Sequence, residues 1–168
     1  SEYLRLATGK HVEDTEYDGY AGLLGTSSEE LWKVIEKLDD YGATELQRAN
    51  YILKFVQYLP YIRDCNNDNY VRYPLETLIE GGGDCEDTSV LAAELLLGTG
   101  YRVVLLTVDT NNNDEVDHMM VGLAVDGATG DTHEVDGVTY YLCETTSASY
   151  RIGQRPQGYV VVGSIAVG

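Results

Sequence analysis

The chain has 168 residues, of which 43% are hydrophobic and 23% are charged. This size and composition are typical of one globular domain with a substantial core. Its 28 acidic residues outnumber the 11 basic ones and give a formal net charge of −17, which argues against nucleic acid as a partner. No window approaches the roughly 20 apolar residues that cross a bilayer, and the opening SEYLRLATGK lacks the apolar core of a signal peptide. We therefore expect one domain over residues 1–168 that makes no membrane contact itself, while its compartment and oligomeric state stay open.

The helical part of the chain comes first. Residues 1–26 contain glycines and scattered tyrosines without a sustained period, so we expect an irregular arm. The run SSEELWKVIEKL (27–38) has a serine cap, early acidic residues and one apolar face, which predicts an amphipathic helix. A second helical pattern at 45–59 follows, and after an Asn-rich loop Pro74 opens a short third helix.

The second half of the chain has the pattern of β-strands, with β-branched runs between clusters of glycine and aspartate. Strand candidates lie at 101–108, 118–126, 138–145 and 158–167. We expect turns in the clusters at 127–137 and 153–158. Helices followed by strands predict an α+β domain in which helices pack on one face of an antiparallel sheet.

The stretch GGGDCEDTSVLAAELLL (81–97) joins these halves and places a cysteine at the start of a helix. Three glycines favour a tight turn, and Asp84 fits the N-cap with Asp87 in the matching position of a capping box. Cys85 is then the first helical residue, where unpaired N–H groups and the helix dipole lower the pKa of a thiol. The charges of Glu86 and Asp87 oppose this unless both side chains point away, and a buried structural cysteine is the alternative.

An activated thiol needs a general base and a third group that orients the base. Of the three histidines, His118 is the best placed because it opens a strand after a polar loop. His11 lies in the arm, and His133 lies in a turn rich in glycine and aspartate. Glu144, at the end of the next long strand candidate, is the expected neighbour of His118 in an antiparallel sheet. The competing orienters are Asp117 and Asp136.

This order of cysteine, histidine and acid resembles the transglutaminase-like superfamily of papain-like cysteine enzymes. The segments FVQYLPY, YPLETL, GGGDCEDTSVLAAELL, GYRVVLL, HMMVGLAV and YYLCETT are similar to microbial transglutaminase-like proteins in order and approximate spacing, over roughly residues 50–150. The resemblance implies a papain-like α+β fold with Cys85 as nucleophile, His118 as base and Glu144 as orienting acid. Members often have an aromatic residue after the histidine and Asp as the acid, where this chain has Met119 and Glu144.

The implied chemistry is acyl transfer on a protein or peptide substrate, without a cofactor. Cys85 attacks an amide or ester carbonyl to form a thioester, which water or an amine then cleaves. Water gives a peptidase or amidase, which we favour because water is always present, and an amine gives a transglutaminase. Gln57 is the candidate partner of the Cys85 N–H in an oxyanion hole. An inactive binding or scaffold module of the same fold is the third alternative.

No metal site is expected. The loop at 109–117 has oxygen ligands at alternate positions, but it lacks the glycine and the final carboxylate of a calcium loop, which favours a solvated loop. The three cysteines form no C-x-x-C pair, which argues against zinc. If Cys85 is catalytic, Cys65 and Cys143 are either a disulfide or two reduced thiols, and both alternatives stay open.

Overall fold

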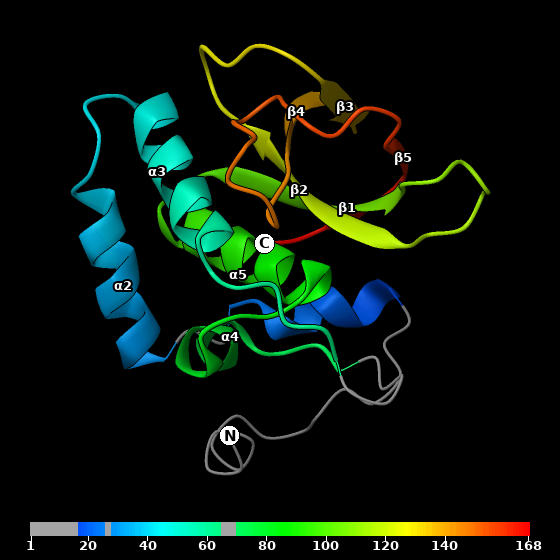
Figure 1. Cartoon of the computed structure of the whole chain (residues 1–168). Helices are drawn as coiled ribbons and strands as arrows, with labels where there is room; N and C mark the ends of the chain where they lie inside the picture. The colour runs from blue at the N-terminus through cyan, green and yellow to red at the C-terminus, as the bar shows by residue number, and fades with distance from the viewer. Residues whose placement is uncertain (1–16, 26–27, 65–69) are drawn as a thin grey trace.

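The computed structural model describes residues 17–25, 28–64 and 70–168, which form helices packed on a sheet (Figure 1). The helices are the 3₁₀ helix η1 (Tyr17–Leu23) and the α-helices α2 (Glu29–Asp39), α3 (Glu45–Gln57), α4 (Pro74–Glu80) and α5 (Cys85–Gly98). The strands are β1 (Arg102–Asp109), β2 (His118–Ala124), β3 (Thr132–Val135), β4 (Val138–Cys143) and β5 (Val160–Ala166). The predicted α+β fold is confirmed.

The five strands form one antiparallel sheet in the order β3-β4-β2-β1-β5. Successive side chains of β1 point to opposite faces. Leu105 joins the large apolar cluster under the helices, whereas Leu106 joins a second cluster on the other face. Val135 of β3 and Val161 of β5 come from opposite edges of the sheet and both pack against this second cluster. The second cluster therefore extends across this face from one edge strand to the other.

Helix α5 lies against the first face of the sheet, beside β1 and β2, with α3 and α4 as its helical neighbours (Figure 1). Apart from Glu86, its side chains from Cys85 to Leu96 are buried. A helix that is apolar on all sides needs cover on all sides, which accounts for its position between the sheet and the other helices. The start of α5 is consequently held at a fixed place in the core.

Local capping begins the helices where the sequence predicts. Ser28 caps α2 and Thr44 caps α3, each by accepting the N–H three residues further on, at 3.3 and 3.2 Å. Pro74 is the first residue of α4, where its missing N–H costs no helical bond. Helix α3 ends at Gln57 rather than next to Pro60, because the residue before a proline is disfavoured in the helical conformation.

The expected irregular arm is partly wrong. Residues 17–23 form η1, and its Tyr20 and Leu23 are buried in the main apolar cluster. A 3₁₀ helix of this length gives too few turns for a clear apolar period. Residues 1–16, the rest of the predicted arm, lie outside the described residues.

The turn expected at 127–137 contains a strand instead. Residues 132–135 form β3, which pairs with β4 so that Val135 lies opposite Val138. The two residues between them, Asp136 and Gly137, have φ angles of 51° and 76°. This is the Asp-Gly hairpin turn that joins two antiparallel strands. The strand β3 was not predicted because turn-forming residues surround it in the sequence.

One apolar cluster draws side chains from η1, α2, α3, α5 and the central strands. The single domain over residues 1–168 stays a prediction, because parts of that range lie outside the described residues. None of the helices in the described part of the chain combines the length and the hydrophobicity needed to span a bilayer.

Candidate active site

Cys85 is the first residue of α5, which confirms the predicted start of this helix. Asp84 is the N-cap, and its N–H donates to the carboxylate of Asp87 at 3.1 Å in the arrangement of a capping box. A Cβ atom at Gly83 would come within 2.4 Å of the Asp87 side chain. Only glycine lets the chain pass this close to the helix start, and Cys85 behind it is 6% exposed.

A buried ion pair supports the turn before Cys85. The guanidinium of Arg72 donates to Asp87, and the backbone N–H of Arg72 donates to the same carboxylate at 2.6 Å. The guanidinium also contacts Asp64 at 3.1 Å and Glu80 at 2.9 Å. The carboxylate of Asp87 is therefore paired with Arg72 rather than with the sulfur, which removes one of the two objections to a reactive thiol.

His118 and Glu144 form the pair that the sequence predicts. His118 opens β2, Glu144 directly follows β4, and these strands are neighbours. Nε2 of His118 lies 2.9 Å from Oε2 of Glu144, and Glu144 is 1% exposed. The other carboxylate oxygen accepts the N–H and the hydroxyl of Thr146 at 2.7 and 2.6 Å. With Nε2 held by the carboxylate, Nδ1 is the nitrogen left to exchange a proton.

The charge on Glu144 is stabilised by these contacts. Burial alone would raise the pKa of Glu144, but the hydrogen bond and charge of His118 and the bonds from Thr146 outweigh burial and lower it. Asp117, one of the competing orienters, is bonded elsewhere, because its carboxylate accepts the N–H and the hydroxyl of Thr110 at 2.8 and 2.7 Å. Asp136 lies in the turn between β3 and β4. Glu144 is thus the acid that the structure brings to the histidine.

Buried hydroxyl groups join the cysteine helix to the two strands. Oγ1 of Thr145 lies 3.0 Å from Oγ1 of Thr88 and 3.1 Å from Oγ of Ser89, on the first turns of α5. Ser89 also donates to the carbonyl of Met119 at 3.1 Å, and a backbone hydrogen bond from Met119 reaches the sulfur of Cys85. The residues that follow the histidine and the glutamate therefore both contact α5, so the three predicted catalytic residues lie in one region.

Gln57, at the end of α3, holds the segment after β4. Its Nε2 donates to the carbonyl of Glu144 at 2.7 Å and to the carbonyl of Tyr150 at 3.0 Å. Both amide hydrogens are used in these bonds, while the buried Oε1 has no hydrogen-bond partner. Gln57 is therefore a positioning residue for Glu144 in this structure, and its role as an oxyanion donor stays a prediction.

Tyr159, the residue directly before β5, packs against the histidine. Its ring lies 5.3 Å from the ring of His118 in an edge-to-face arrangement, with an interplanar angle of 66°. The sequence analysis did not single out this residue. This aromatic residue comes from the segment directly before the last strand, so the sequence around His118 carried no signal for it.

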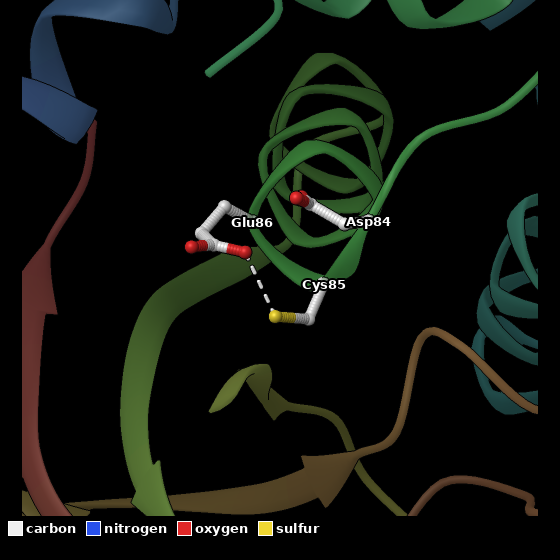
Figure 2. A group of neighbouring side chains, drawn as sticks. All are labelled: Asp84, Cys85 and Glu86. Atoms are coloured by element: carbon white, nitrogen blue, oxygen red, sulfur yellow. Dashed lines mark hydrogen bonds between the residues drawn. The ribbon is translucent and has the colours of Figure 1, made fainter. Parts of the chain in front are cut away.

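The side chain of Glu86 points at the sulfur of Cys85 (Figure 2). The thiol donates a hydrogen bond to Oε2 of Glu86 at 2.8 Å. Burial raises the pKa of the Cys85 thiol, and the charge of Glu86 and this hydrogen bond raise it further against the opposing bond from Met119. The expectation that the helix start lowers this pKa is wrong for this structure, in which burial and Glu86 raise it.

Two groups of ligand atoms among the described residues lie close enough to hold a metal ion. One group is Asp84, Cys85 and Glu86, and the other is Asp64, Asp84 and Asp87, with the atoms of each within 4.8 Å of one another. Asp84 belongs to both, and its buried Oδ1 has no hydrogen-bond partner. Burial, followed by the charges of Glu86 and Asp87, raises the pKa of Asp84 to about 8. The acidic residues on both sides of Cys85 in the sequence, Asp84 and Glu86, were the signal that could have indicated the first of these two groups.

The loop at 109–117, considered above for calcium, uses its acidic side chains internally. The carboxylate of Asp109 accepts backbone N–H groups from Asn111, Asn112 and Asp114 at distances from 2.7 to 3.0 Å. Such bonds are typical of Asx turns. The solvated loop that the sequence favours fits this arrangement.

The remaining sequence candidates lie away from this region or outside the described residues. His133 is on β3, which is separated from β2 by β4. Cys143 is a buried free thiol at the end of β4. His11 and Cys65 lie outside the described residues.

A family model described as a transglutaminase-like domain, DUF553, matches residues 25–129. The chain belongs to this family. The match includes Cys85 and His118 and ends before Glu144. The resemblance seen in the sequence is thereby confirmed. A comparison with curated protein sequences finds no match.

Solved structures show the same fold. Calcium-bound LapG from Legionella pneumophila aligns with a TM-score of 0.58 and 15% identity, over 90% of this chain and 84% of LapG. EGTA-treated LapG aligns with a TM-score of 0.57 and 15% identity, over 89% of this chain and 81% of LapG. A proposed cysteine protease from Cytophaga hutchinsonii aligns with a TM-score of 0.58 and 16% identity, over 81% of this chain and 42% of that protein. At these identities the likeness concerns the fold alone.

Proposed function

We propose that this transglutaminase-like chain is a cysteine peptidase, with Cys85 as nucleophile, His118 as general base and Glu144 as orienting acid. The observation that supports this most is the 2.9 Å contact between Nε2 of His118 and the buried carboxylate of Glu144. A carboxylate in this position fixes the imidazole tautomer and stabilises the imidazolium that forms during the reaction. The helix start that carries Cys85 is tied to both strand ends through Thr145 and Met119.

In the first half of the reaction, Nδ1 of His118 takes the thiol proton of Cys85 as the sulfur attacks the carbonyl carbon of the substrate. The new C–S bond pushes an electron pair onto the carbonyl oxygen, and the Cys85 N–H at the start of α5 can donate to this oxyanion. When the oxyanion collapses, the C–N bond breaks. The leaving nitrogen takes the proton from His118, and a thioester on Cys85 remains.

In the second half, Nδ1 of His118 takes a proton from water while the water oxygen attacks the thioester. The C–S bond then breaks, the carboxylic acid product leaves, and the proton returns to the sulfur. An amine in place of water would give transamidation by the same steps. Glu144 acts in both halves by holding the proton on Nε2, and Gln57 acts on the position of Glu144.

The proposal includes a calcium ion beside the nucleophile. LapG is known in a calcium-bound form, and Asp84 and Glu86 of this chain offer the carboxylate oxygens that calcium prefers. The buried Oδ1 of Asp84, which has no hydrogen-bond partner, fits such a cation. A divalent cation at a site of this kind favours the charged forms of the carboxyl and thiol groups around it. Asp84 and Glu86 would hold the ion, and Glu86 would then turn its charge to the ion instead of to the thiol.

The peptidase proposal is tested with reduced, carboxamidomethylated lysozyme, a fully unfolded protein, in calcium and in EGTA. Mass spectrometry detects fragments, and dansylcadaverine in the same mixture reports transamidation. We expect fragments with the parent and none with Cys85→Ala or His118→Ala, while His133→Ala on β3 retains activity. Fragments that persist in Cys85→Ala contradict the proposal. Amine incorporation without fragments identifies a transglutaminase, and neither product in calcium identifies an inactive module.

The calcium part is tested by thermal unfolding. An ion that binds only the folded state raises the unfolding temperature as its concentration rises. We expect this rise in the parent and its loss in Asp84→Asn and Glu86→Gln. Asp114→Asn, in the loop at 109–117, is the matched control and keeps the rise. A rise that survives Asp84→Asn but disappears in Asp114→Asn places the ion in that loop instead.

A further inference from the structure

A row of exposed aromatic side chains follows α3 towards Cys85. We name it the aromatic stripe, and its members are Tyr41, Tyr51, Phe55, Tyr58 and Tyr61. Their exposed fractions range from 36% at Phe55 to 73% at Tyr58. The three members in and after α3 are spaced by four and three residues, so they share one face of the helix. The first member is continuous with them, because its ring lies 6.1 Å from that of Tyr51.

A continuous row differs from scattered exposed side chains. Single exposed apolar residues are normal on protein surfaces, whereas contiguous apolar patches mark interaction sites. The other exposed large apolar side chains include Trp32 on α2, Ile79 on α4 and Val162 on β5. These come from separate elements, while the stripe is built of tyrosine and phenylalanine, which are enriched in binding interfaces.

The stripe ends at the open edge of a short extended segment. The Ile62 N–H donates to the carbonyl of Gly83 at 2.9 Å, and the Gly83 N–H donates to the carbonyl of Pro60 at 3.3 Å. In this parallel pairing the N–H and C=O of Tyr61 point to the side away from Gly83. The described part of the chain gives these two groups no backbone partner. An edge of this kind can accept a further strand from another polypeptide.

The open edge adjoins the nucleophile. Gly83, the pairing partner of Tyr61, lies two residues before Cys85. Burial, followed by the electrostatic influence of the nearby Cys85, Asp84 and Glu86 groups, raises the pKa of Tyr61 to about 12. The phenol of Tyr61 therefore lies within electrostatic range of the sulfur. Tyr61, the last member of the stripe, is thus joined through Gly83 to the segment that carries Cys85.

We propose that an extended polypeptide substrate packs its apolar side chains on the aromatic stripe and pairs its backbone with Tyr61 as it enters the Cys85 site. This inference rests on the proposed peptidase function and gives its substrate class. A segment that adds a strand to an edge must itself be extended, so the substrate is an unfolded or flexible region rather than a folded surface. The net charge of −17 further favours segments that carry Lys or Arg, whose cations stack well on tyrosine rings.

Binding is measured without turnover, on a Cys85→Ala background. The probe is fluorescein-labelled, reduced and carboxamidomethylated lysozyme, and fluorescence anisotropy gives its Kd. We expect Phe55→Ser combined with Tyr58→Ser to raise the Kd by at least about tenfold, as loss of interface aromatics does elsewhere. Val162→Ser is the matched control for loss of an exposed apolar side chain and leaves the Kd unchanged. Native, folded lysozyme binds at least about tenfold more weakly than the unfolded probe.

The backbone pairing is tested by amide hydrogen exchange. We expect the Tyr61 N–H to exchange more slowly when the probe is bound, because a hydrogen-bonded amide is protected. The proposal is overturned if the double variant binds like its parent, or if the Tyr61 exchange rate does not change. It is also overturned if the double variant only converts a dimer to a monomer, which assigns the stripe to self-association. None of these outcomes depends on cleavage, so the peptidase proposal is judged separately by Cys85→Ala.

Discussion

On the sheet side of the candidate active site, His118 and Glu144 already touch, whereas on the helix side the sulfur of Cys85 is bonded to Glu86. In the first pair, His118 stabilises the charged form of Glu144. The second contact joins two groups that are both negative when ionised, so it raises the pKa of the thiol. Under the proposed function, the pair on the sheet side is already in place, and the contact that opposes a reactive thiol lies on the helix side.

The largest expected effect tests the pair of His118 and Glu144 on the sheet side. Glu144→Gln keeps the shape of the side chain but removes its charge and its preference for one imidazole tautomer. We expect the kcat for cleavage of unfolded lysozyme to fall by about 10³- to 10⁴-fold, as for orienting acids in other triads. Glu134→Gln on the exposed edge strand β3 is the matched control. If Glu144→Gln retains parental activity, the contact with His118 is structural only.

The next largest effect tests the buried ion pair between Arg72 and Asp87, which supports the turn before Cys85 on the helix side. Arg72→Met leaves the buried carboxylate of Asp87 without its cation, and breaking a buried pair in this way costs about 3–5 kcal/mol of the free energy of unfolding. Urea unfolding measures this loss, and Arg102→Met on the exposed start of β1 serves as control. Adding Asp87→Asn to Arg72→Met recovers part of the loss. An unchanged unfolding free energy in Arg72→Met would show that this ion pair does not stabilise the turn.

A smaller effect tests the contact between Glu86 and the Cys85 thiol, which distinguishes the helix side from the sheet side. Glu86→Gln removes the charge next to the thiol, so in EGTA we expect iodoacetamide to alkylate Cys85 about tenfold faster at neutral pH, which corresponds to about 1.4 kcal/mol. Glu115→Gln, in the exposed loop before β2, is the control. Equal alkylation rates in Glu86→Gln and the parent would mean that Glu86 does not restrain the sulfur.

The smallest effect is the dependence of stability on pH. The folded-state pKa of Glu144 is lowered, mainly by His118 against the opposing effect of burial. Its stabilising contribution is therefore present above the unfolded pKa of about 4.5 and is lost as the pH falls through the lower folded value. We expect the difference in unfolding free energy between the parent and Glu144→Gln to shrink steadily as the pH falls below 4.5. A difference that grows below this pH contradicts the lowered pKa.

The features predicted correctly are those with local causes. Asp84 and Asp87 mark the start of α5 within four residues, and Pro74 marks the start of α4. The pairing of His118 with Glu144 follows from two long strand patterns that are close in the sequence. The fold class follows from the order of these elements, and the family match agrees with it.

The features that the sequence does not reveal depend on contacts between distant residues or on a choice of rotamer. Gln57 bonds to the carbonyls of Glu144 and Tyr150, which are far away in the chain. Tyr159 reaches His118 from the residue directly before the last strand. Glu86 is next to Cys85 in the sequence, but its charge affects the thiol only because its side chain turns towards the sulfur. No sequence pattern predicts which way such a side chain rotates.

The hydroxyl groups of Thr145, Thr88 and Ser89 have a consequence for how the molecule opens. They are buried, and separating the end of β4 from α5 would leave them without partners, at a cost of about 1–3 kcal/mol each. Local opening between the end of β4 and α5 therefore carries this cost in addition to the loss of apolar contacts. Rotation of the Glu86 side chain away from the sulfur breaks none of these hydroxyl contacts, so it could change the environment of Cys85 without such an opening.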